Sequence, residues 1–154
     1  MFRFLTTCAL LTAAVTMHQI PAFAGENHHE PVIIDMESAS WKTMNDAGVE
    51  VAVLSGNPSE PGVYSLIMKV PQGVKTSVHT HADVWRHSVV ISGTLYFAFG
   101  DGWDADSLIP MGPGTFFAEG PTDAHYAWAK DGPVVAFVTA MGPTSTEALA
   151  PPPE

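Results

Sequence analysis

Two histidines, His79 and His81, have a spacing that suits two ligands of one metal ion. His79 and His81 are separated by one residue, and His125 lies in a later block of the sequence. Side chains at positions i and i+2 of a β-strand point to the same face, so His79 and His81 can reach one ion together. Imidazole nitrogens suit a divalent transition metal (iron, manganese, nickel, copper or zinc). On residue types alone, the alternative is a polar strand face exposed to water.

Short apolar runs closed by turn residues predict that these histidines lie on β-strands. Stretches rich in Val, Ile, Phe, Tyr and Thr recur from residue 49 onward, and each ends at Gly, Pro, Asn or Asp. No segment keeps the i, i+3, i+4, i+7 spacing of a helix with a core face over ten or more residues. The pattern is typical of an all-β sandwich or barrel. We expect eight strands, at 49–54, 63–70, 77–81, 86–91, 94–99, 115–119, 124–129 and 134–140.

The first 24 residues have the features of a cleaved export signal. Arg3 precedes the apolar stretch 4–17, and Ala22 and Ala24 provide the small residues that a signal peptidase requires. The apolar stretch is too short and too often interrupted by polar residues for a transmembrane helix. We therefore expect an exported protein, periplasmic or secreted, with no membrane span after the signal is removed.

Composition limits the partners and the stabilising chemistry. The chain has 154 residues, of which 46% are hydrophobic, and this is enough for one domain. A formal net charge of −10 disfavours nucleic acids and anionic membranes, so the expected partner is a small-molecule ligand. The single cysteine, Cys8, lies in the predicted signal, so neither a disulfide nor a thiolate is expected in the mature chain.

The segments outside the strands have simple expected roles. Residues 25–48 are predicted to form an N-terminal arm with an edge strand, and residues 142–154 a flexible, Pro-rich tail. The barrel itself is expected to span residues 49–141. His28 and His29 lie in the polar arm and are expected to be solvated rather than to act as ligands.

The two histidine blocks resemble the motifs of the cupin superfamily. The first motif reads G-x5-H-x-H-x3,4-E-x6-G, and the second reads G-x5-P-x-G-x2-H-x3-N. The sequence also resembles small exported single-domain cupins, through the stretches Ser-Gly-Thr-Leu-Tyr at 92–96 and His-Tyr-Ala-Trp-Ala at 125–129. The residues that match the two motifs are Gly73, His79, His81, Gly93, Gly114 and His125.

This resemblance covers about residues 49–144 and implies a fold and a site. The implied fold is the double-stranded β-helix, an RmlC-like, jelly-roll barrel with the three histidines inside it. Cupins of this build include dioxygenases, isomerases, decarboxylases and lyases, so the resemblance does not select one reaction.

The resemblance fails at Arg86, which stands where the first motif has its metal-binding glutamate. A guanidinium carries a permanent positive charge and cannot act as a ligand. A metal site would then use the three histidines alone, or add His87 through a β-bulge, or add Asp83 from the connecting turn. The three-histidine site comes first because it needs no change of register, and plain strand alternation directs His87 out of the pocket.

Two functions follow from these residues. In the first, the protein is a metalloenzyme, a dioxygenase, isomerase or lyase, that acts on a small carboxylate, enol or diol. In the alternative, it is a non-catalytic protein that binds a carboxylate or sugar, and Arg86 binds the ligand through paired hydrogen bonds.

Further expectations concern the pocket wall and the assembly. Arg86 and Tyr96 are expected to line the substrate pocket. No catalytic base is assigned, because no Asp or Glu stands at a motif position. Tyr126 and Trp128 should face away from His125, where aromatic side chains usually pack between layers or protomers, so a homodimer is a candidate assembly.

Overall fold

Eleven β-strands and one short 3-10 helix occur in the part of the chain that the computed structural model describes, residues 31–153. The predicted export signal, residues 1–24, and the His28-His29 pair lie outside the described residues. The helix, η1, spans only Ala105–Ser107. In this described part, no helix has the length and apolar character needed to cross a membrane.

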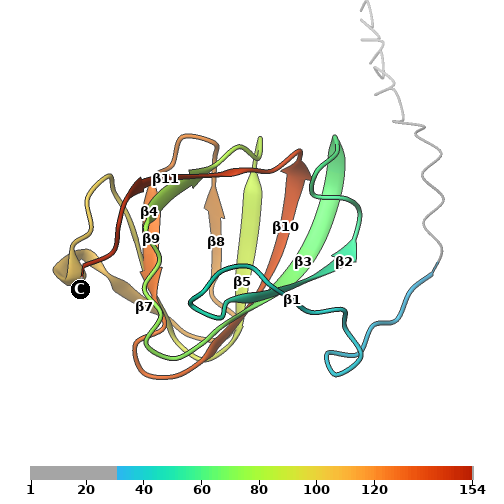
Figure 1. Ribbon diagram of the computed structural model, residues 1–154, viewed down its shortest axis with the longest axis horizontal. Helices are drawn as coiled ribbons and strands as arrows, with labels where there is room; N and C mark the ends of the chain where they lie inside the picture. The colour runs from blue at the N-terminus through green and yellow to red at the C-terminus, as the bar shows by residue number, and fades with distance from the viewer. Residues whose placement is uncertain (1–30, 154) are drawn as a thin grey trace, which may run out of the picture. The chain divides into compact units, whose positions relative to one another are not determined.

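The strands form two antiparallel sheets that face each other (Figure 1). From β3 to β11 the chain passes repeatedly between the sheets, as in a jelly-roll barrel. The larger sheet has the order β1 (Lys42–Thr43), β2 (Glu50–Ser55), β3 (Gly62–Val70), β10 (Val134–Gly142), β5 (Arg86–Ser92), β8 (Phe116–Glu119). The smaller sheet has the order β11 (Thr146–Ala150), β4 (Val78–His81), β9 (His125–Trp128), β6 (Leu95–Phe99), β7 (Ile109–Met111).

All eight strands predicted from the sequence are present, with ends that differ by at most two residues. An edge strand was expected within residues 25–48, and β1 lies there, at the edge of the larger sheet; the structure adds β7 and β11 in the smaller sheet. The expectation of a flexible tail from residue 142 was wrong. β11 pairs with β4 from Thr146 opposite His81 to Ala150 opposite Val78. This pairing gives the tail a hydrogen-bonded partner that its own composition does not reveal.

Alternation along the strands places the core between the sheets. On β3, Tyr64, Leu66 and Val70 are buried, and they share one face because side chains alternate along a strand. One apolar cluster joins both sheets, and Val90, Phe97 and Val134 belong to it. The smaller sheet also packs on its outer face, where Val78, Ala98 and Tyr126 form a second buried cluster beside Trp103.

The turn between β5 and β6 depends on a glycine. Gly93 has a φ of 78°, in the left-handed region that residues with a Cβ rarely adopt. A Cβ at this position would also collide with the carbonyl oxygen of Pro133, just before β10. Gly73 has a similar φ of 84°, but open space surrounds the place of its missing Cβ. Substitutions at the two positions therefore separate the energetic cost of the left-handed backbone angle from the cost of the collision with Pro133.

We expect Gly93→Ala to lower the free energy of unfolding by more than Gly73→Ala does. Each change carries the cost of a left-handed alanine, about 1–2 kcal/mol. Only Gly93→Ala also pushes the β5–β6 turn away from β10. Urea denaturation of both variants measures the difference. Equal losses would show that the contact with Pro133 does not constrain the turn.

Candidate metal centre

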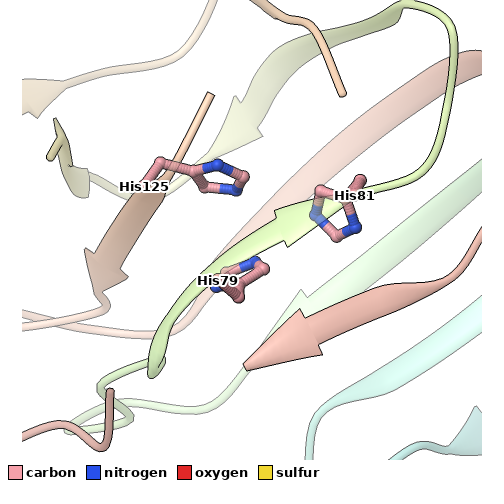
Figure 2. Close-up of side chains that lie close together, drawn as sticks. All are labelled: His79, His81 and His125. Carbon is pink, nitrogen blue, oxygen red and sulfur yellow. The ribbon is translucent and has the colours of Figure 1, made fainter. Parts of the chain in front are cut away.

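The three histidines lie together where β4 and β9 meet in the smaller sheet. His79 is directly opposite His125 in the antiparallel pairing of these strands, and His81 follows two residues later on the same face. Figure 2 shows the three rings near one another, two carried by β4 and one by β9. One ring nitrogen from each residue falls within 4.8 Å of the others. For comparison, two ligand atoms on opposite sides of one ion, each bound at about 2.0–2.1 Å, lie roughly 4 Å apart.

Backbone carbonyl groups orient two of the rings. Nδ1 of His79 lies 2.8 Å from the carbonyl oxygen of Ser77, and Nδ1 of His125 lies 2.8 Å from that of Asp123. A carbonyl oxygen only accepts hydrogen bonds, so each Nδ1 carries the hydrogen and donates it. Nε2 of each ring is therefore the nitrogen that is left to bind a metal.

Burial keeps two of these imidazoles neutral. Desolvation is the largest cause of the lowered pKa of His79. Desolvation, followed by the positive charge of Arg86, lowers the pKa of His81 to about 2. Thr146, on β11, contacts the His81 ring, and its Oγ1 lies 3.2 Å from Nδ1 of that ring. At neutral pH both rings can accept a cation without first losing a proton.

The three histidines line a cavity between the two sheets. Its volume is about 110 Å³. Apolar walls with a few convergent polar groups are typical of small-molecule sites. The apolar lining includes Met68, Val70, Leu95, Phe97, Phe117, Val134, Ala136 and Val138.

Arg86 also reaches this cavity, but its guanidinium is held by other side chains. Nη1 donates to the hydroxyl of Tyr64 at 2.9 Å and to Oδ2 of Asp83 at 3.2 Å. Nε lies 3.0 Å from Oε1 of Glu119. Tyr64 donates to Oδ1 of Asp83 and Thr144 donates to Oδ2, each at 2.8 Å. The departure from the cupin motif at position 86 is therefore part of a buried ion network.

Neither of the additional ligands considered from the sequence joins the three histidines. Asp83 is only 1% exposed, and both of its carboxylate oxygens are used within the network around Arg86. His87 does not line the cavity, and its ring packs beside Trp85 and Phe116, with centroids 4.8 and 5.4 Å away. Strand alternation accounts for the position of His87, because its neighbour Arg86 faces the cavity.

Tyr96, expected in the pocket wall, does not line the cavity. Its hydroxyl donates to Asp131 at 2.6 Å. Leu95 and Phe97, the neighbours of Tyr96 on β6, line the cavity instead, because successive side chains of a strand point to opposite faces. The phenol of Tyr96 is thus directed away from the histidines.

One acidic residue at the site was missed by the sequence reasoning. Glu119 ends β8, is 6% exposed and lies opposite Arg86 in the pairing of β5 with β8. Its Oε2 lies 2.9 Å from Nε2 of His125. A signal was present in the sequence: Glu119 closes the apolar run Phe116-Phe117-Ala118, and alternation places its side chain on the inner face with Phe117.

These residues fit a metal cation. The three imidazoles offer nitrogen ligands of the kind that divalent transition metals prefer. Beside them, the buried Oε2 of Glu119 receives no hydrogen bond from the described residues. A cation at this place would meet lone pairs and negative charge that the protein itself leaves unsatisfied.

Comparison with known proteins gives a match in fold. No protein-family model and no curated protein matches the chain. The polyketide cyclase RemF from Streptomyces resistomycificus has a TM-score of 0.63 at 14% identity, over 78% of this chain and 86% of that one. The DMSP lyase DddQ from Ruegeria pomeroyi DSS-3 has a TM-score of 0.60 at 17% identity, over 77% of this chain and 64% of that one.

An RmlC-like cupin from Shewanella frigidimarina NCIMB 400 has a TM-score of 0.57 at 17% identity, over 73% of this chain and 91% of that one. The chain spans 57% and 64% of two DMSP lyase structures, less than two thirds of their length. At these identities the likeness concerns the fold. Two facing antiparallel sheets and these neighbours show that the chain has the double-stranded β-helix fold of the RmlC-like cupins.

Proposed function

We propose that this protein is a metal-dependent cupin that acts on a small carboxylate, enol or diol. His79, His81 and His125 would hold one divalent transition metal. The convergence of these three imidazoles on one cavity is the observation that carries the proposal. When bound, such a metal polarises an oxygen atom of the substrate as a Lewis acid.

The protein's own residues supply binding and orientation. The apolar walls around Leu95, Phe97 and Phe117 exclude water from a small ligand and leave its polar end for the histidines. The structural neighbours include a lyase and a cyclase, so the fold does not choose the reaction. Lewis-acid polarisation of a substrate oxygen would serve dioxygenase, isomerase and lyase chemistry alike.

The alternative function, non-catalytic ligand binding through Arg86, has less support. A guanidinium grips a carboxylate through two parallel N–H donors. In this structure Nε of Arg86 faces Glu119, and Nη1 faces Asp83 and Tyr64. A ligand carboxylate would have to displace buried partners that already carry negative charge.

Metal titration tests the proposed site. Calorimetric titration of the protein with Zn²⁺ and Ni²⁺ should give one ion per chain. Replacing His79, His81 or His125 by Ala should weaken binding by more than about a hundredfold, because each change removes a ligand rather than a supporting contact. His87→Ala is the matched control and should leave the affinity unchanged, since His87 lies outside the cavity. Absence of binding by the unmodified protein would refute the site.

The lowered pKa values of His79 and His81 predict tolerance to mild acid. Protons compete with the metal, and an ordinary imidazole loses up to about tenfold in affinity per pH unit below about 6.5. With its pKa lowered to about 2, His81 holds no competing proton at pH 5. Zn²⁺ affinity should therefore fall less than about a hundredfold from pH 6 to pH 5, where three ordinary imidazoles would lose up to about a thousandfold. Calorimetry at both pH values decides between these results.

We also propose that the chain is exported and loses residues 1–24. The support is Arg3 before an apolar stretch, followed by the small residues Ala22 and Ala24. Mass spectrometry of the mature protein should find Gly25 at its N-terminus. A mature pool that retains Met1 to Ala24 would contradict the proposal.

A further inference from the structure

We propose that Glu119 is a fourth metal ligand, supplied by β8 in place of the carboxylate that the cupin motif puts at position 86. This inference rests on the metal site proposed above and adds one residue to it. Three observations carry it: the atoms that face each other between Glu119 and His125, the balance of buried charge, and the pairing of β8 with β5.

Oε2 of Glu119 faces Nε2 of His125 at the spacing of two ligands of one ion. Nδ1 of His125 donates to the carbonyl oxygen of Asp123, which leaves Nε2 as the ring nitrogen available to a metal. Nε2 lies 2.9 Å from Oε2 of Glu119, and Oε2 receives no hydrogen bond from the described residues. Neighbouring ligands of one ion, each bound at about 2.0–2.1 Å at a right angle, are likewise about 2.9 Å apart.

Arg86 is shared between two buried carboxylates. Asp83 and Glu119 both contact its guanidinium, and all three residues are at most 8% exposed. A buried carboxylate that is only partly compensated is energetically costly. Arg86 contacts Oε1 of Glu119 and leaves Oε2 directed at His125. A divalent cation beside Oε2 would complete the compensation of this carboxylate.

Strand pairing explains how β8 can supply this carboxylate. Arg86 and Glu119 are opposite each other on neighbouring antiparallel strands, so their side chains lie on the same face of the sheet. Both residues line the cavity with the three histidines. A carboxylate at either position can reach this cavity. In this chain Arg86, on β5, holds the carboxylate of Glu119, on β8, in place.

Zinc affinity of Glu119 variants tests this role. Glu119→Gln removes the charge, and Glu119→Asp keeps it beside Arg86 while drawing the carboxylate back by one methylene group. We expect both changes to weaken Zn²⁺ binding, measured by competition with a chelating dye, by about 10- to 100-fold or more. Glu147→Gln, on exposed β11, is the matched control and should bind like the unmodified protein.

The outcomes separate this inference from the proposed function. If the unmodified protein binds no Zn²⁺, the proposed metal site fails and the role of Glu119 fails with it. If the unmodified protein binds Zn²⁺ and both Glu119 variants bind it equally well, only the role of Glu119 is refuted. If Glu119→Asp keeps full affinity and Glu119→Gln does not, Glu119 merely balances the charge of Arg86, and the inference is again overturned.

A measurement on the unmodified protein covers the case in which the variants fail to fold. Infrared difference spectra on addition of Zn²⁺ should show a shifted carboxylate stretching band if a glutamate becomes a ligand. The same shift should persist in Glu147→Gln. A spectrum without any carboxylate shift would overturn the inference.

Discussion

The buried guanidinium of Arg86 is the constraint on which the arrangement of the site depends. A permanent positive charge removed from water requires negative partners and hydrogen bonds on several sides. Asp83 and Glu119 provide the charge, and the hydroxyl of Tyr64 provides a further contact. These partners come from the β4–β5 turn, β8 and β3, and Thr144 adds the segment before β11 through Asp83. The network therefore fixes four segments around the three histidines.

Such a network is weak evidence for stability alone. The cost of desolvating buried ions often equals or exceeds what their attraction returns, and apolar residues of similar size frequently serve as well. Its position is more informative than its energy. The network lies on the wall of the same cavity as the imidazoles, and one of its carboxylate oxygens is left unsatisfied and directed at His125.

Local pattern predicted most of the barrel because period-2 alternation and turn residues are local properties. β3 and β5 show this well: Tyr64 and Leu66 face inward, and so do Arg86 and Ser88. β7 was missed because Pro110 interrupts a three-residue strand. β11 was missed because it is held by its pairing with β4, and its own exposed residues carry no burial pattern. Tyr96 was misplaced by one residue, which on a strand reverses the face.

The grouping of the histidines could be predicted, whereas the position of Glu119 beside Arg86 and His125 could not, for a physical reason. His79 and His81 share a face through local geometry, and their relation to His125 follows the cupin spacing. The relation of Glu119 to Arg86 exists only in the register between β5 and β8, across more than thirty residues of chain. A motif records positions along the chain, whereas a ligand set is defined by positions in space. When two neighbouring strands present side chains to the same cavity, a carboxylate can be carried by one strand instead of the other. The sequence motif is then incomplete, although a carboxylate still lies at the cavity.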